Sequence, residues 1–339
     1  TDGDDARRQS LTLLLAAALI GLALSGDLFN LYVFYELAAV ASYGLIAGNR
    51  ASASFVAGFR YLMISALGSV VGLLGIALIY FKTGTLNLAQ LATLGHELAD
   101  PLGLAAFAML VIGFGVKAEL FPVNGWVPEV YGAASRRVAA LLAGLASKLA
   151  VLAIVRILLL VFPTDEARQL LLVLGILGVV SGELAAYQAR DLGRMLAWSS
   201  IGQLGVVFIA FSLPGEAGLI AGVAVALHHL VVKSALFLLA ERWGGAIDRL
   251  RGAAASSWLG AALFVLFSLS LLVVPPLPGF FEGSNSSVGA IICRPAIIES
   301  RSSPVIPAGL VQAASAWKVL VGLATPPVPR LVGEPTSAR

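Results

Sequence analysis

Apolar segments of about 20 residues follow one another along most of this chain, and they constrain its fold more than any other feature. A helix needs about 20 residues to cross the roughly 30 Å hydrocarbon core of a bilayer. Of the 339 residues, 59% are hydrophobic and only 12% are charged, against roughly a quarter charged in soluble domains. We therefore expect an all-α polytopic membrane protein and not a soluble domain with a membrane anchor.

The hydropathy of the chain predicts about nine transmembrane helices. Their approximate spans are 11–26, 28–47, 55–81, 101–121, 138–161, 168–188, 194–213, 216–240 and 257–281. The first two meet at Gly26 and Asp27 and should form a helical hairpin. Pro122 and Pro128 interrupt the fourth, because a proline removes a backbone donor and clashes with the preceding turn. We expect a broken helix over about 101–134.

Lysine and arginine are unevenly divided between the two ends of these helices. Lys82 and Arg168 lie at one end, and the other end holds Arg7, Arg8, Arg50, Arg136, Arg137, Arg190, Arg194, Arg242, Arg249 and Arg251. Cytoplasmic loops are enriched in these residues. The pattern predicts a multi-pass protein of the plasma membrane with a cytoplasmic N-terminus. The apolar run that follows Gly26 favours a retained first helix over a cleaved signal peptide.

The last part of the chain differs from the rest. Residues 282–339 are rich in proline, with scattered serine and arginine and no clear amphipathic period. Such a composition is typical of an irregular segment. We therefore expect a transmembrane domain over 1–281 and an irregular tail over 282–339.

Several classes of function leave no trace in the sequence. The net charge of +3 is too small to indicate nucleic-acid binding. The single cysteine, Cys293, can form neither an internal disulfide nor a thiolate metal cluster. No glycine-rich phosphate loop, metal-ligand spacing or nucleophile motif is present in a plausible setting. We expect no catalytic residue, cofactor or metal, and no enzyme activity of the chain by itself.

Five ionisable side chains fall near the middle of the predicted helices: Glu36, Lys117, Lys148, His229 and Lys233. Such groups are costly in a membrane, and they usually face a bundle interior or a wet cavity. Lysine suits a proton relay because the loss of water disfavours its charged form, so that it can load and release a proton. A nearby carboxylate has the opposite effect, so a movement of Glu36 relative to Lys117 would act as a switch. The break at Pro122 lets water reach Lys117.

A structural role is the alternative for each of these groups. A buried Lys–Glu pair can simply hold helices together, but five groups at one depth favour a path. His228 points about 100° away from His229 around the helix, so we expect it to pack or to form a local hydrogen bond. The role of Glu119 stays open between an interior partner and a function elsewhere. Glu183 is interpreted as structural.

Several motifs resemble the large antiporter-like subunits shared by Mrp-type cation/proton antiporters, respiratory complex I and membrane-bound hydrogenases. The motifs are GDLFNLYVFYE at 26–36, KAELFP at 117–122, RDLGRMLAWSSIGQ at 190–203, HLVVKSALF at 229–237 and VPPLPGF at 274–280. They occur in the order and spacing of the family over about residues 11–281. Within this family, the chain is most similar to the Mrp-type D subunits.

The resemblance implies a fold of two inverted repeats of five helices each. The first repeat would occupy about 11–161, and the second, incomplete repeat would occupy about 168–281. Each repeat contains a broken helix, the first at Pro122 and the second at Pro275 and Pro276.

The resemblance also implies roles for the five ionisable residues. Glu36 and Lys117 would be the coupled pair of a first half-channel. Lys148 would be the next relay group, and Lys233 with His229 would carry the path towards the second half.

The sequence departs from the family in several places. Family members usually have further helices, so we expect this chain to lack the first three and the last two. After Phe281 the family has a lysine that ends the relay, whereas this sequence reads EGS at 282–284. Asn124 replaces a frequent histidine, and residues 134–137 replace a proline-rich turn. The path is therefore expected to lose its outlet.

Three functions follow from these observations. The first is a proton-translocating subunit of an Mrp-type Na+/H+ antiporter complex, in full or truncated form, that works with other membrane subunits. The second is the proton-pumping subunit of an NADH-quinone oxidoreductase or hydrogenase complex, in which a partner does the redox chemistry. The third is an inactive membrane fragment. Lys148 and the DLFNL run at 27–31 favour the first.

Overall fold

The computed structural model describes residues 2–48, 51–243, 245–250 and 257–271, and these residues form a helical bundle. Within these ranges, seven helical segments are long and apolar enough to cross a membrane: α1 (Asp2–Leu24), α2 (Leu28–Ala47), α3 (Ser52–Thr83), residues 136–160, α9 (Asp165–Gln188), α10 (Leu192–Ser212) and α11 (Gly215–Ala240). Two shorter apolar helices are α5 (Pro101–Gly115) and α13 (Trp258–Leu271). The predicted all-α membrane architecture is confirmed.

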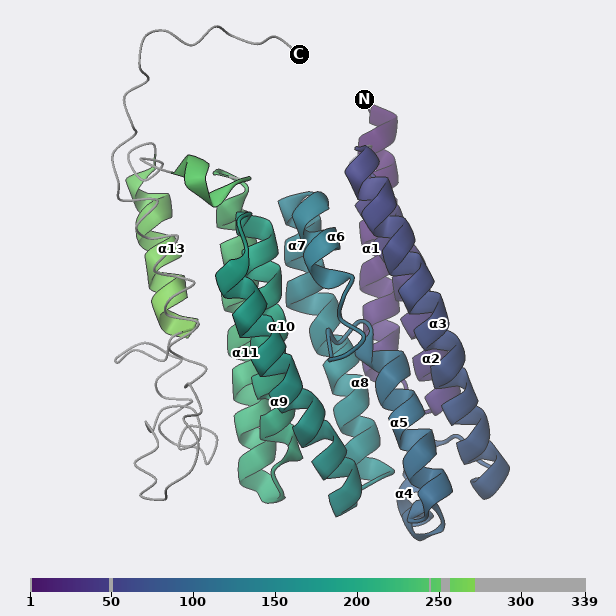
Figure 1. Cartoon of the computed structure of the whole chain (residues 1–339). Coiled ribbons are helices and arrows are strands. Elements are labelled where there is room, and N and C mark those ends of the chain that lie inside the picture. The colour runs from purple at the N-terminus through teal and green to yellow at the C-terminus, as the bar shows by residue number, and fades with distance from the viewer. Residues whose placement is uncertain (1, 49–50, 244, 251–256, 272–339) are drawn as a thin grey trace, which may run out of the picture.

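The helices lie side by side, and their order in space largely follows their order in the chain (Figure 1). α1, α2 and α3 form one flank, and α9, α10 and α11 lie towards the other, with α13 beyond α11. The segment 136–160 consists of α7 (Arg136–Leu141), a π-helical turn (Leu142–Ala146) and α8 (Ser147–Leu160), and it stands between the two groups. The short helices α4 (Leu88–Thr93) and α6 (Val127–Ala133) complete the bundle, with 3-10 turns at Gly95–Leu98 and Ile247–Leu250.

Two predicted spans are interrupted in ways that the sequence did not predict. The first half of the broken crossing ends at Gly115 and not at residue 121, and α6 resumes at Val127. The span predicted over 138–161 is not one α-helix, because a π-helical turn at Leu142–Ala146 interrupts it. The second break at Pro275 and Pro276, the EGS run at 282–284 and the tail at 282–339 lie outside the described residues.

The connections between helices are short and capped. Asp27 lies in the turn between α1 and α2 and caps the start of α2. Its carboxylate accepts hydrogen bonds from the amides of Phe29 (2.8 Å) and Asn30 (3.1 Å). Asn87 caps α4 in the same way. Asp27 and Asn87 also pair through a single antiparallel bridge, so the caps of two helices are joined at one end of the bundle.

Glycine allows two pairs of helices to pack with their backbones close together. A Cβ atom on Gly113 of α5 would lie 2.7 Å from the Cα of Gly72 on α3. A Cβ atom on Gly182 of α9 would lie 2.5 Å from the amide nitrogen of Gly202 on α10. Small residues serve this purpose in membrane helices, because lipid gives no hydrophobic force between helices and close contact must supply the attraction.

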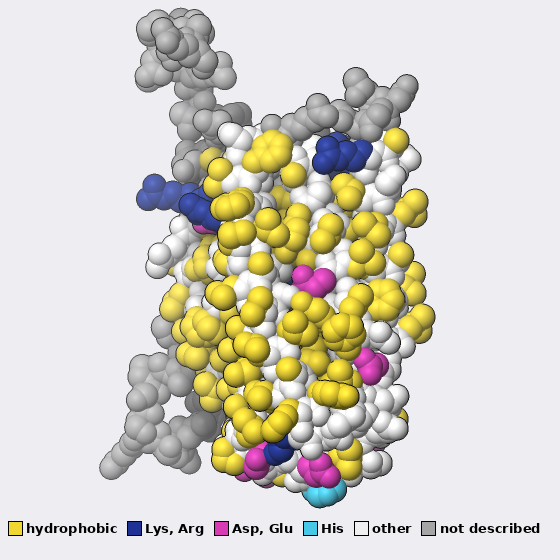
Figure 2. Space-filling model, turned by 90° about the vertical axis from the view of Figure 1, so that its right-hand side faces the viewer, with side chains coloured by type: hydrophobic (Ala, Val, Ile, Leu, Met, Phe, Trp, Pro, Cys, Tyr) yellow, Lys and Arg dark blue, Asp and Glu magenta, His cyan; other side chains and the backbone are white. Residues whose placement is uncertain are grey.

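Apolar side chains also cover the outside of the bundle. Figure 2 shows them over most of one flank, with the basic side chains gathered towards the two ends and only scattered acidic groups between. Phe29, Val33, Phe55, Phe59 and Leu67 of α2 and α3 are among the exposed apolar side chains. In water such a surface would be unstable, so its natural solvent is lipid.

The basic residues divide between the two ends of the bundle. Arg137 pairs with Glu241 beside the end of α11 (3.2 Å), whereas Lys82 pairs with Asp100 at the opposite end, where α3 stops and α5 begins. Arg50 and Arg251 lie outside the described residues. Which end faces the cytoplasm stays a prediction from the sequence.

Lys82 and Asp100 connect α3 to α5. The Nζ atom of Lys82 lies 2.6 Å from Oδ1 of Asp100, and the same carboxylate accepts a hydrogen bond from the amide of Gly103 (2.8 Å). The hydrogen bond from Lys82, and then the one from the Gly103 amide, lower the pKa of Asp100 below its ordinary value.

An Asp100→Asn variant should show the contribution of this pair through its pH dependence. Asparagine still caps α5 but carries no charge. A carboxyl whose folded pKa is depressed stabilises the fold above its unfolded pKa of about 3.9, and this contribution is lost as the pH falls through the folded pKa. Wild type should therefore melt at a slightly higher temperature than the variant at neutral pH, and the gap should close as the pH falls through the lowered pKa of Asp100. A thermal unfolding series in detergent measures this gap, and a gap independent of pH would contradict the prediction.

Candidate functional site

Lys117 lies in the non-helical segment between α5 and α6, and its side chain is only 4% exposed. Pro122 lies in the same break. The indole Nε1 of Trp126 donates a hydrogen bond to the carbonyl of Val116 (2.9 Å). This bond satisfies a backbone acceptor beside Lys117 that the interrupted helix leaves without its usual partner. The break is thus stabilised from within the protein.

The ammonium group of Lys117 lies against an aromatic ring. Its Nζ atom is 3.4 Å from the centroid of Tyr35, a cation–π geometry, and 3.5 Å from Oγ of Ser65. The Tyr35 hydroxyl donates to the carbonyl of Gly113 (2.6 Å), which holds the ring in place. Glu36, the next residue, interacts electrostatically with Lys117 but forms no ion pair with it, and its buried Oε1 atom has no hydrogen-bond partner. Glu36 and Lys117 are therefore neighbours without direct contact.

Lys148 is the second residue after the π-helical turn. A π turn disturbs the regular hydrogen bonding of a helix, and such turns are frequent at functional sites. The carbonyl of Ala143, inside the turn, accepts hydrogen bonds from Nζ of Lys148 (2.5 Å) and from Oγ of Ser147 (2.8 Å). Gly144 lets α11 approach the turn, since a Cβ there would lie 1.9 Å from Oγ of Ser234. The turn thus places Lys148 against the part of α11 that carries Lys233.

Lys233 and His229 lie one turn apart on α11, and both side chains are fully buried. The Nζ atom of Lys233 donates to Oγ of Ser199 (2.7 Å) and to the carbonyl of Leu196 (3.3 Å) on α10. Neither ring nitrogen of His229 has a hydrogen-bond partner. His228 instead makes a hydrogen bond of 2.8 Å to Ser270 on α13, which is one of the two roles expected for it.

The structure brings the five predicted residues into two groups. Glu36 and Lys117 form the first group, between α2 and the break. Lys148, His229 and Lys233 form the second group and interact electrostatically with one another. The second group joins α8 to α11.

Glu119 belongs to the second group, and the sequence left its role open. It has a backbone φ of +58°, a left-handed conformation that non-glycine residues rarely adopt. Its Oε1 atom accepts a hydrogen bond from the hydroxyl of Tyr131 (2.7 Å), and the carboxylate interacts electrostatically with Lys148 and Lys233. Its position two residues after Lys117, inside the predicted break, was the one signal that could have identified it.

Glu183 of α9 is a second buried carboxylate in this region. It is 4% exposed and interacts electrostatically with Lys233. From the sequence, Glu183 was interpreted as structural, and a single glutamate on an apolar helix gives no indication of its partner.

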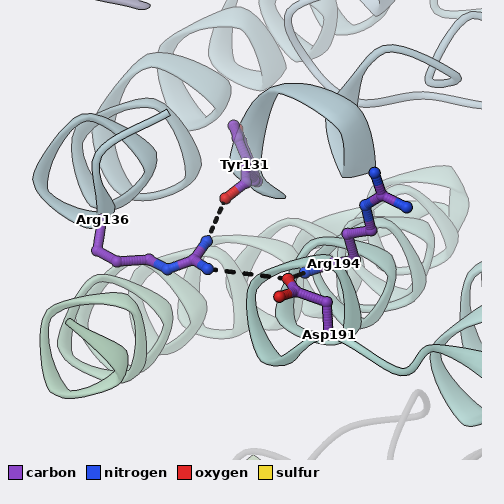
Figure 3. Close-up of polar contacts among 4 residues, drawn as sticks. All are labelled: Tyr131, Arg136, Asp191 and Arg194. Carbon is purple, nitrogen blue, oxygen red and sulfur yellow. Dashed lines mark hydrogen bonds and ion pairs between the residues drawn. The ribbon is translucent and has the colours of Figure 1, made fainter. Parts of the chain in front are cut away.

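Arg136 fixes the backbone of Tyr131 (Figure 3). Its guanidinium donates to the Tyr131 carbonyl (2.5 Å) and lies 3.8 Å from the carboxylate of Asp191. Asp191 also caps α10 by accepting from the amide of Arg194 (3.0 Å). A Cβ on Gly193 would lie 1.8 Å from the guanidinium, so this glycine provides the space for Arg136. The contact ties α6 and α7 to the start of α10.

No group of three histidine, cysteine, aspartate or glutamate side chains within the described ranges could hold a metal ion.

The sequence matches a family of membrane proteins. The family described as NADH:quinone oxidoreductase/Mrp antiporter, TM, matches residues 25–291. The chain is 37% identical over 284 residues to NADH-quinone oxidoreductase subunit N of Desulforudis audaxviator, an alignment that covers 80% of this chain and 56% of that protein. It is 34% identical over 281 residues to the D subunit of the Na(+)/H(+) antiporter of Alkalihalophilus pseudofirmus, with 79% and 56% covered.

A solved structure shares the fold. A chain of the Mrp complex from Dietzia sp. superposes with a TM-score of 0.82 at 31% identity, covering 96% of this chain and 61% of that one. This similar chain is thus part of a membrane complex with several subunits. The present chain spans about half the length of the curated relatives that it matches.

Proposed function

Because the chain belongs to the NADH:quinone oxidoreductase/Mrp antiporter membrane family, we propose that it translocates protons as a membrane subunit of an Mrp-type Na+/H+ antiporter complex. The protons would pass by way of Glu36, Lys117, Lys148, His229 and Lys233. One observation carries the proposal: three lysines are buried inside the bundle without an ion pair. Other membrane subunits would complete the complex.

The partners of these lysines support a transport role over a purely structural one. Lys117 contacts a ring and a hydroxyl, and Lys148 and Lys233 contact hydroxyls and carbonyls. A lysine locked in a buried ion pair would release its proton only by leaving an uncompensated carboxylate behind. Lysines held by neutral groups, with carboxylates nearby but not in contact, can change their charge at a lower cost.

Glu36 is suited to control the first step. Its carboxylate interacts electrostatically with Lys117 without an ion pair and has one buried oxygen free of hydrogen bonds. A small movement that brings Lys117 and Glu36 closer would favour the ammonium form of Lys117. A movement that separates them would favour release of its proton. The non-helical segment around Lys117 is the part of the crossing where such a movement breaks the fewest helical hydrogen bonds.

A second candidate is the proton-pumping subunit of a redox complex. The 37% identity to an NADH-quinone oxidoreductase subunit N favours it. The two candidates differ in what drives transport. In the antiporter, an imposed Na+ gradient moves protons without an electron donor, whereas in the redox complex proton movement requires electron transfer.

Proton uptake by membrane vesicles that contain the chain with its partner subunits tests the proposal. Lys117→Ala should lower the initial rate of uptake by about tenfold or more, equivalent to about 1.4 kcal/mol of barrier. Lys82→Ala, a lysine replaced at the end of α3, serves as the matched control and should keep the rate of wild type. Equal uptake by wild type and Lys117→Ala would reject the proposed function. Driving uptake by a Na+ gradient alone separates the antiporter from the redox complex.

A further inference from the structure

We propose that Glu119 and Glu183 are the charge partners of Lys148 and Lys233, so that each lysine of the second group has a buried carboxylate of its own. They would act as positioning residues for proton transfer, because they act through the lysines and do not themselves belong to the path proposed above. This inference rests on the proposed function.

The surroundings of Glu119 indicate a role beyond accepting the hydrogen bond from Tyr131. Its side chain is 1% exposed, yet only Oε1 is bonded, and Oε2 is buried without a hydrogen-bond partner. The backbone is held in a left-handed conformation, which persists only where the surrounding structure enforces it. A glutamate at such a position is unfavourable for folding alone. The nearby charge that offsets its burial is that of Lys148, with a further contribution from Lys233.

The missing side chain of Gly202 leaves the space that the carboxylate of Glu183 occupies. A Cβ atom on Gly202 of α10 would lie 2.3 Å from Oε1 of Glu183 and 3.0 Å from its Cδ, so any other residue at 202 would displace the carboxylate. Its Oε2 atom is also buried without a hydrogen-bond partner. Lys233 of α11 is the basic group that interacts electrostatically with it. The other titratable groups that interact with Lys233 are Glu119, Lys148 and His229.

The balance of charge in the second group supports the pairing. In their charged forms, two carboxylates and two ammonium groups would cancel, and all four side chains are removed from water. A buried charge without an opposite charge nearby is strongly unfavourable, so the removal of one member leaves its partner uncompensated. The alternative is that Glu119 serves only as the acceptor for the Tyr131 hydroxyl. Substitutions at Glu119 and Tyr131 can separate the effect of the charge of Glu119 from the effect of its hydrogen bond.

The first test uses the vesicle assay with variants at Glu119. Glu119→Gln keeps an acceptor for Tyr131 but removes the charge, and uptake should fall by about tenfold, or about 1.4 kcal/mol. Glu119→Asp and Tyr131→Phe keep the charge and should stay within about twofold of wild type. Glu216→Gln, in the exposed first turn of α11, is the matched control. If Glu119→Gln transports normally, or if Tyr131→Phe loses transport as strongly as Glu119→Gln, the charge role is overturned.

The second test does not depend on transport. Thermal unfolding in detergent is compared for Glu183→Gln, Lys233→Gln and the double variant. Each single variant leaves one charge uncompensated, so the double variant should melt at a higher temperature than the sum of the two single losses predicts. Additive losses would show that the two residues do not interact and would overturn the pairing. If Lys117→Ala lowers uptake while these variants behave additively, only this inference fails; if Lys117→Ala has no effect, the proposed function fails.

Discussion

Replacing Gly113 by leucine is expected to abolish the accumulation of folded protein. A Cβ atom at this position would lie 2.7 Å from Cα of Gly72, 3.0 Å from the carbonyl oxygen of Gly68 and 3.1 Å from the amide nitrogen of Gly72. All three atoms belong to the backbone of α3, so no side chain can rotate away. Overpacking a core costs about 1–3 kcal/mol where side chains can adjust. Here α3 and α5 would have to separate, and the cost should exceed that range.

Fluorescence-detected size-exclusion chromatography of detergent extracts measures this effect. Gly113→Leu should show little or no monodisperse peak, whereas the control Gly125→Leu should keep most of it. No atom lies within 4 Å of a Cβ built on Gly125, although this glycine also lies on the α5–α6 crossing. A full-sized peak for Gly113→Leu would mean that α3 and α5 do not pack through their backbones.

Lys233→Gln is expected to lower proton uptake by about a hundredfold while the protein still folds. Loss of a positioned proton-transfer group typically costs a factor of about 100 to 10,000. Glutamine is close in length to lysine and can still donate to Ser199, but it cannot carry a transferable proton. Lys233 is fully buried and interacts electrostatically with both Glu119 and Glu183, so no water-exposed group nearby can replace it.

Initial rates of uptake, normalised to the amount of monodisperse protein, check this expectation. Lys82→Gln makes the same chemical change in a lysine that pairs with Asp100 at the end of the bundle. It should transport at nearly the rate of wild type. A Lys233→Gln variant that is folded and equally active would remove Lys233 from the path.

Hydropathy predicted the helices well because lipid selects for apolar residues over the whole span. The prediction of 28–47 coincides with α2. The helix predicted from residue 11 instead begins at Asp2, because a helix can continue past the apolar layer and hydropathy detects only that layer. The end of α5 at Gly115 precedes the predicted end by six residues. The left-handed backbone of Glu119 and the missing amide donor of Pro122 both prevent the helix from continuing through this segment.

The burial of a charged residue inside the bundle could be predicted from the sequence, but its partner could not. Lys117, Lys148 and Lys233 are buried, as expected from their places near the middle of apolar spans. The role of Glu119 stayed open and that of Glu183 was interpreted as structural. These helices are apolar on nearly every side, so periodicity does not reveal which face is turned inward. The pairing joins the break to α8 and α9 to α11, and such contacts between separate segments leave no pattern in the sequence.

The π-helical turn at Leu142–Ala146 has a consequence for the direction of Lys148. A π turn accommodates one residue more than the regular helix, which amounts to a rotation of about 100° between the helical turns on its two sides. Arg136 anchors the preceding end through Tyr131 and Asp191. The inward aim of the lysine is therefore set by a single surplus residue, and shortening this stretch by one would turn Lys148 to another side of the helix without any change in its chemistry.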